Sequence, residues 1–160
     1  MIFITLGSQK FQFNRLLKAI DELVETGEIQ DEVFAQTGYS DYEPKNYQFK
    51  QFLGREEFVT VTGKADIVIT HGGTGAIIGA VKKGKKVIAV PRRAKNGEHV
   101  DDHQLQLVGQ FKELNLICEC LYTEKIGEAL ETVKRTEYKA YKSNTKTILD
   151  SIEKYIEESN

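Results

Sequence analysis

The chain has 160 residues, of which 40% are hydrophobic and 29% charged, a composition typical of a soluble globular protein. This length suits one domain, so we expect residues 1–160 to form a single domain. The formal net charge of -2 gives no sign of a nucleic-acid partner. No apolar stretch approaches the length of a membrane span, and the N-terminus lacks the features of a signal peptide, which predicts a cytoplasmic protein.

The first half of the chain begins as strand, glycine turn and helix. Residues 1–6 form a short apolar run, and apolar residues over 13–24 follow helical spacing, with Asn14 or the residues just before it as a cap and Gly27 as the end. Further strands are predicted at 32–36 and 47–53, and a short helix at 55–64.

The second half continues the alternation. Its predicted strands span 67–69, 87–90 and 116–121. Its predicted helices run from the glycine turn to residue 83, over the apolar positions 105–111, over 123–133, and over 137–158. Asp101 or Asp102 is placed to cap the second of these helices.

The pattern predicts an α/β fold. About six strands alternate with helices, and most strands are apolar runs without alternation, as in parallel sheets that are covered on both faces. We therefore predict a Rossmann-like, doubly wound parallel sheet, with the loops that follow the strands on one edge, where ligands bind in such sheets.

The turn at residues 71–75 reads H-G-G-T-G and joins a strand to a helix. It is neither a dinucleotide-binding fingerprint nor a P-loop. Glycines let backbone N–H groups approach a phosphate, and a helix N-terminus favours anions. The alternative is a tight turn that needs positive φ and close packing, without a ligand.

The loop at residues 91–99 follows the next strand and is long, polar and charged. Arg92 and Arg93 could pair with phosphate oxygens, and Asp102, His103 and Gln104 could bond to hydroxyl groups. The lysines at residues 82–86 could instead sit at a solvated helix end, which the helix dipole favours.

Three further features allow more than one interpretation. His99 and His103 have the spacing of a zinc-binding pair, but the helix cap between them breaks the shared face, so we expect no metal site. His71 could take part in the chemistry or could have a structural role as a hydrogen-bonded orienting residue. Cys118 and Cys120 point to one face of a strand and are expected to be reduced packing residues.

Three segments together resemble a known family. They are T-L-G-S-Q-K-F-Q-F-N-R-L-L at 5–17, H-G-G-T-G-A-I at 71–77, and V-P-R-R-A-K-N-G-E-H-V-D-D-H-Q-L at 90–105. The set resembles the C-terminal, nucleotide-sugar-binding half of family 28 glycosyltransferases. It is most similar to the small bacterial subunits of two-piece transferases in exopolysaccharide and capsule synthesis. Those subunits are relatives of the catalytic subunit of the eukaryotic dolichol-linked N-acetylglucosaminyltransferase.

The resemblance implies one half of a GT-B enzyme, a UDP-sugar donor and inverting transfer without a metal or other cofactor. It also implies a membrane-anchored partner subunit, which supplies the other half and the lipid-linked acceptor and holds this chain peripherally at the membrane. The residues implied for donor binding are Gly7, Ser8, His71, Gly73, Thr74, Gly75, Ala76, Arg92, Arg93, His103 and Gln104. Among them, the residues at 73–76 would face the diphosphate, His103 and Gln104 the sugar hydroxyls, and Gly7 and Ser8 the phosphates or the acceptor.

One position departs from the resemblance. Many family members have a glutamate for the ribose hydroxyls where this chain has Gly79. Either another carboxylate such as Glu98 substitutes for it, or nucleotide affinity is weak without the partner. The departure keeps open an accessory subunit that stabilises or recruits the membrane transferase. A free-standing nucleotide-binding enzyme of the same fold is a third hypothesis.

Overall fold

A computed structural model describes residues 1–140, 142, 150 and 154. The strands are β1 (Ile2–Thr5), β2 (Val33–Gln36), β3 (Gln48–Lys50), β4 (Ile67–His71), β5 (Lys86–Val90) and β6 (Cys118–Glu119). The α-helices are α1 (Asn14–Glu25), α2 (Arg55–Lys64), α3 (Thr74–Lys82), α4 (His103–Glu113) and α5 (Ile126–Arg135), with short 3-10 helices at Ala94–Asn96 and Thr123–Lys125.

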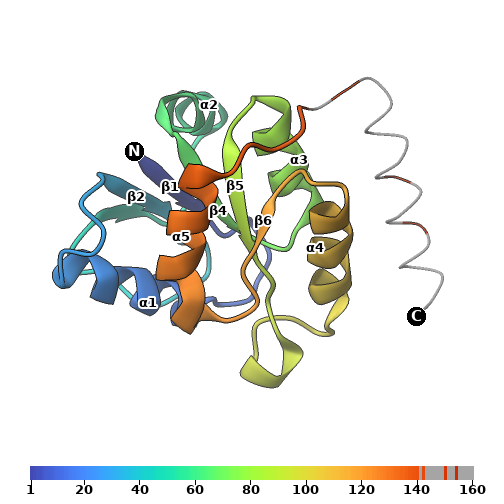
Figure 1. Cartoon of the computed structure of the whole chain (residues 1–160). Coiled ribbons are helices and arrows are strands. Elements are labelled where there is room, and N and C mark those ends of the chain that lie inside the picture. Colours follow the sequence, from blue (N-terminus) through green and yellow to red (C-terminus); the bar gives the residue numbers. More distant parts are fainter. Residues whose placement is uncertain (141, 143–149, 151–153, 155–160) are drawn as a thin grey trace.

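The six strands form one sheet in the order β3-β2-β1-β4-β5-β6, and every pair is parallel (Figure 1). All strand-to-helix loops therefore open on the carboxyl edge, as predicted. β1 and β4 are neighbours in the centre, and the chain leaves them towards opposite ends of the sheet. This is the topological switch point, where doubly wound sheets leave a crevice.

Helices cover both faces of the sheet. On one face, α1 and α5 contact each other and pack on Ile2, Ile4 and Ile69 (Figure 1). On the other face, α2, α3 and α4 pack on Phe3 and Val68. Because the central strands are buried on both faces, they carry apolar side chains at successive positions, which explains the runs in the sequence. The doubly wound prediction is confirmed.

Two predicted elements differ at the end of the chain. The strand expected at 116–121 is confined to Cys118–Glu119, with one further ladder bond from Cys120 N–H to the Ala89 carbonyl. The helix expected at 137–158 does not begin at 137, because Thr136 is extended, residues 136–140 form no helix and Lys139 N–H bonds to the Asn115 carbonyl. The rest of that segment lies outside the described residues, except 142, 150 and 154. Both cysteines are buried and unpaired, as predicted.

Candidate functional site at the carboxyl edge

The glycine turn between β4 and α3 is shaped by close contacts rather than by backbone conformation. Gly73, the N-cap of α3, has a φ of -77°, so the turn does not need the positive φ that was one of the two interpretations. A Cβ on Gly73 would lie 2.2 Å from His71 Cε1, and a Cβ on Gly72 would lie 2.7 Å from Gln104 Cβ. Only glycine fits at these two positions.

Gln104 holds the turn from the start of α4. Its side-chain oxygen accepts hydrogen bonds from the N–H groups of Gly72 (3.1 Å) and Arg92 (3.0 Å). Its amide nitrogen therefore faces His71 Nδ1, 3.3 Å away. Because the buried side chain is engaged inside the protein, the predicted contact with sugar hydroxyls does not fit this placement, and Gln104 is a positioning residue.

His71 is neutral at physiological pH. Burial and then the charge of Arg92 lower its pKa to about 3. The Gln104 amide donates to Nδ1, so the neutral ring carries its proton on Nε2. That atom lies against the first loop, because a Cβ on Gly7 would be 2.6 Å from it. His71 is thus a neutral N–H donor wedged between the β1 loop and the turn.

Arg92 is buried beneath the first loop. Its guanidinium donates to the carbonyl oxygens of Leu6 (2.6 Å), Phe11 (2.9 Å), Gln12 (3.2 Å) and Glu98 (3.4 Å), and only 1% of the residue is exposed. Burial lowers its pKa to about 10, which leaves it charged at neutral pH. The side chain points into the protein and connects the loop after β1 to the loop after β5. The direct phosphate contact expected of Arg92 therefore does not fit this placement.

Glu98 cannot replace the glutamate expected at position 79. Its carboxylate is buried and accepts two hydrogen bonds from Arg15, each 3.0 Å, and one from Arg93 N–H. The Arg93 guanidinium bonds to the Leu121 carbonyl and lies over the Tyr122 ring, on the β6 side of the edge. Neither charged group is directed at the turn.

His99 and His103 share one carboxylate. Their Nδ1 atoms lie 3.3 Å and 3.5 Å from the two oxygens of Asp101. Within the described part of the chain, no three His, Cys, Asp or Glu side chains are grouped to hold a metal ion. His103 is partly exposed at the edge, where a ligand can reach it.

The lysines after α3 mostly serve helix ends. Lys85 Nζ donates to the carbonyl of Gly63 near the end of α2, and Lys86 Nζ donates to the carbonyl of Lys134 in the last turn of α5. Both start from the amino end of β5, away from the glycine turn. This supports the helix-end interpretation for these two lysines.

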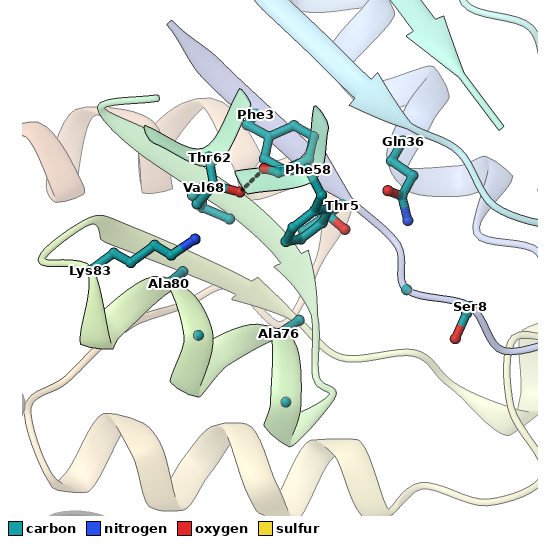
Figure 2. A pocket seen from close by; sticks show the side chains of 13 residues that line it. Phe3, Thr5, Ser8, Gln36, Phe58, Thr62, Val68, Ala76, Ala80 and Lys83 are labelled. Carbon is teal, nitrogen blue, oxygen red and sulfur yellow. Dashed lines mark hydrogen bonds between the residues drawn. The ribbon is translucent and has the colours of Figure 1, made fainter. Parts of the chain in front are cut away.

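A cavity of about 300 Å³ lies at the switch point, between α2 and α3 (Figure 2). Of the predicted site residues, Gly7, Ser8, Gly75 and Ala76 line it. The His71 ring lies directly behind Gly7 and against Gly73. Thr74, Arg92, Arg93, His103 and Gln104 do not line it. The sequence reasoning missed the lining residues Thr5, Gln36, Phe58, Thr62 and Lys83. Thr5 and Gln36 are the last residues of their strands, which was the signal that could have found them.

The N-terminus of α3 forms one end of this cavity. The first hydrogen bond of the helix is from Ile77 N–H to the Gly73 carbonyl, which leaves the N–H groups of Thr74, Gly75 and Ala76 without an intrahelical partner. The first turn contains no acidic residue. Free amides and the helix dipole together favour a phosphate here.

The fold defines a Rossmann-like domain with a cavity at its switch point. Residues 1–158 match the family description "Glycosyltransferase family 28 C-terminal domain", so the chain belongs to this family. In the described residues, none of the helices is both long enough and apolar enough to cross a bilayer.

Sequence relatives include two fungal proteins named "UDP-N-acetylglucosamine transferase subunit ALG13". The chain is 35% identical over 60 residues to the protein of Saccharomyces cerevisiae, a match that covers 38% of this chain and 28% of the relative. It is 31% identical over 78 residues to the protein of Kluyveromyces lactis, a match that covers 48% of this chain and 38% of the relative. The matches thus span less than two fifths of these relatives.

Solved structures share the fold at low sequence identity. The glycotransferase of kitacinnamycin superposes with a TM-score of 0.61 at 15% identity, over 97% of this chain and 38% of that one. MurG of Acinetobacter baumannii superposes with a TM-score of 0.56 at 17% sequence identity, over 94% of this chain and 49% of that one. A solution structure of ALG13 superposes with a TM-score of 0.54 at 18% sequence identity, over 86% of each chain. The fold is therefore one half of the GT-B arrangement.

Proposed function

We propose that this chain is the donor-binding subunit of a two-component inverting glycosyltransferase. It binds a UDP-sugar, and a membrane-anchored partner subunit supplies the lipid-linked acceptor. The observation that carries the proposal is the cavity that joins the free amides of α3 to the β1 loop at the switch point. Family membership and the named transferase subunits among its relatives support the same reaction class.

In this mechanism the chain stabilises the leaving group. Negative charge grows on the diphosphate as the sugar departs, and the amides of Gly75 and Ala76 are aimed at that charge. The buried charge of Arg92, which already lowers the His71 pKa, adds positive potential without touching the ligand. His71 Nε2–H is a neutral donor beside the same loop.

The acceptor has to be activated by the partner. Among the described residues, no carboxylate lines the cavity, and His71 is protonated on the atom that faces the loop, so this site offers no group to take a proton from an acceptor hydroxyl. We therefore assign the general base to the membrane-anchored subunit. Exopolysaccharide or capsule synthesis is the process we propose, on the motif resemblance alone.

An accessory role is the second candidate. It is favoured by the inward direction of Arg92 and Gln104, which removes two expected ligand contacts. In that case the chain stabilises the partner and binds no nucleotide.

Calorimetric titration with UDP separates the two, on the chain alone and on the complex with the partner. Gly75→Asp is the informative variant, because nothing lies within 4 Å of a Cβ at this position and the new carboxylate repels phosphate. Gly63→Asp in α2, equally open, is the matched control. We expect UDP affinity to fall at least tenfold in Gly75→Asp and to hold in Gly63→Asp. Absence of UDP binding in chain and complex alike would leave the accessory role.

A further inference from the structure

Two polar residues line the cavity from neighbouring strand ends, and their side chains are not engaged by the protein. Gln36 ends β2 and is 7% exposed, and Thr5 ends the adjacent strand β1 and is 3% exposed. The two residues are paired in register, so their side chains leave the same face of the sheet, towards α2 and α3 (Figure 2). In the described part of the chain, neither the Gln36 carboxamide nor the Thr5 hydroxyl makes a hydrogen bond to protein.

These two polar groups face the open cavity. Among the described residues, the fully buried side-chain atoms without a hydrogen-bond partner are Arg92 Nε and Arg93 Nε, so the polar atoms of Gln36 and Thr5 keep contact with solvent in the cavity. The Thr62 hydroxyl, by contrast, is already engaged, because it donates to the Phe58 carbonyl at 2.8 Å. The unengaged groups of Gln36 and Thr5 are therefore available to a polar ligand in the cavity.

The position of these groups identifies the part of the ligand that they meet. Gly75 and Ala76, at the N-terminus of α3, line the same cavity, and Gly79 lines it one helical turn further on. A Cβ on Gly79 would meet nothing within 4 Å, so that wall offers space and no side chain. In a nucleoside diphosphate bound by the α3 amides, the ribose follows the phosphate directly into this space.

The chemistry of the groups is that of a hydroxyl site. A carboxamide accepts one hydrogen bond and donates another, and a threonine hydroxyl can do either. Neighbouring hydroxyls of a ribose are both donors and acceptors.

We propose that Gln36, assisted by Thr5, binds the ribose hydroxyls of the nucleoside diphosphate and makes the site selective for ribonucleotides. The inference rests on the proposed donor function. It assigns ribose recognition to the ends of β1 and β2, in place of a carboxylate on α3.

The test compares UDP with 2′-deoxy-UDP by calorimetry, on the chain or on the complex where only the complex binds. We expect the wild type to bind UDP about tenfold more tightly, as for one lost hydrogen bond. In Gln36→Leu, UDP affinity falls about tenfold, deoxy-UDP affinity is unchanged, and the preference disappears. Gln36→Glu keeps the preference, because a carboxylate accepts bonds from two hydroxyls. Gln110→Leu, on the exposed side of α4, is the matched control.

Each outcome decides one question. Equal affinity for the two nucleotides in the wild type, or a preference that survives Gln36→Leu, overturns the ribose assignment and leaves the donor function standing. No binding of UDP to any form overturns the donor function itself. If Gln36→Leu does not fold, Thr5→Val, which is nearly isosteric, provides the same comparison with a smaller loss.

Discussion

His71 is the residue through which the site responds to pH. Its pKa is about 3 in the folded protein against an ordinary value of 6.5, because burial and the Arg92 charge oppose protonation. Below pH 6.5 the unfolded chain takes up a proton that the folded protein excludes. The free energy of unfolding therefore decreases as the pH is lowered. The loss from this group is about 2 kcal/mol between pH 7.5 and pH 5.

Urea unfolding of the wild type and His71→Gln at these two pH values measures this loss. We expect the wild type to lose about 2 kcal/mol more than the variant. The other two histidines, His99 and His103, are present in both proteins. The same pH dependence in both would show that His71 is not held neutral by burial.

Arg92 illustrates a second effect at this scale, the fixing of loops by one buried cation. Arg92→Met leaves four carbonyl oxygens without their donor, and we expect a loss of about 3 kcal/mol in the free energy of unfolding. Arg92→Lys should restore only part of the lost free energy of unfolding, because an ammonium group lacks the planar set of donors that a guanidinium has. Arg55→Met, an exposed arginine, is the control. A loss below 1 kcal/mol would mean that the loops hold their shape without the guanidinium.

The direction of side chains is what the sequence could not supply. Arg92, Arg93 and Gln104 were selected correctly as residues of the carboxyl edge, but each points into the protein. A strand end places a residue at the edge, and only the packing around it decides whether the side chain faces the ligand. The same limit hid Gln36, whose neighbours A-Q-T-G carry no distinctive motif.

At the scale of elements, the glycine turn and α3 form one unit. We expect Gly73→Ala to cost about 2 kcal/mol, because its methyl group overlaps the His71 ring. Gly75→Ala, in open space on the same helix, should gain up to about 0.5 kcal/mol from helix propensity. Chemical denaturation of both variants tests the contrast. Equal stabilities would mean that the His71 ring can move aside.

The elements themselves were largely predictable. Helix α2 has the predicted bounds, and β4 and β5 extend the apolar runs by one or two residues. These apolar runs can be recognised in the sequence because both faces of the sheet are covered by helices. β6 is shorter than predicted, because the edge of the sheet offers a partner strand on one side only. The segment after 135 carries apolar residues at helical spacing, but Thr136 is extended and ends α5.

For the molecule as a whole, the crevice is only half enclosed. The cavity has walls from this chain on the sheet side, and the kitacinnamycin glycotransferase, which shares the fold, is more than twice as long, since the chain covers 38% of it. A diphosphate bound here keeps one side in water. Its interactions with the α3 amides are then weaker than in a closed site.

This geometry predicts that the isolated chain binds UDP without transferring a sugar. At a UDP concentration ten times its Kd for the wild type, binding should raise the free energy of unfolding by about 1.4 kcal/mol, whereas the rise in Gly75→Asp should be at most about 0.4 kcal/mol. Turnover of a UDP-sugar should appear only when membranes containing the partner are added, because that subunit supplies the base and the second wall. Membranes with Gly75→Asp provide the control for background hydrolysis. Sugar transfer by the chain alone would refute the division of labour, since every group needed for proton removal would then have to lie on this side of the crevice.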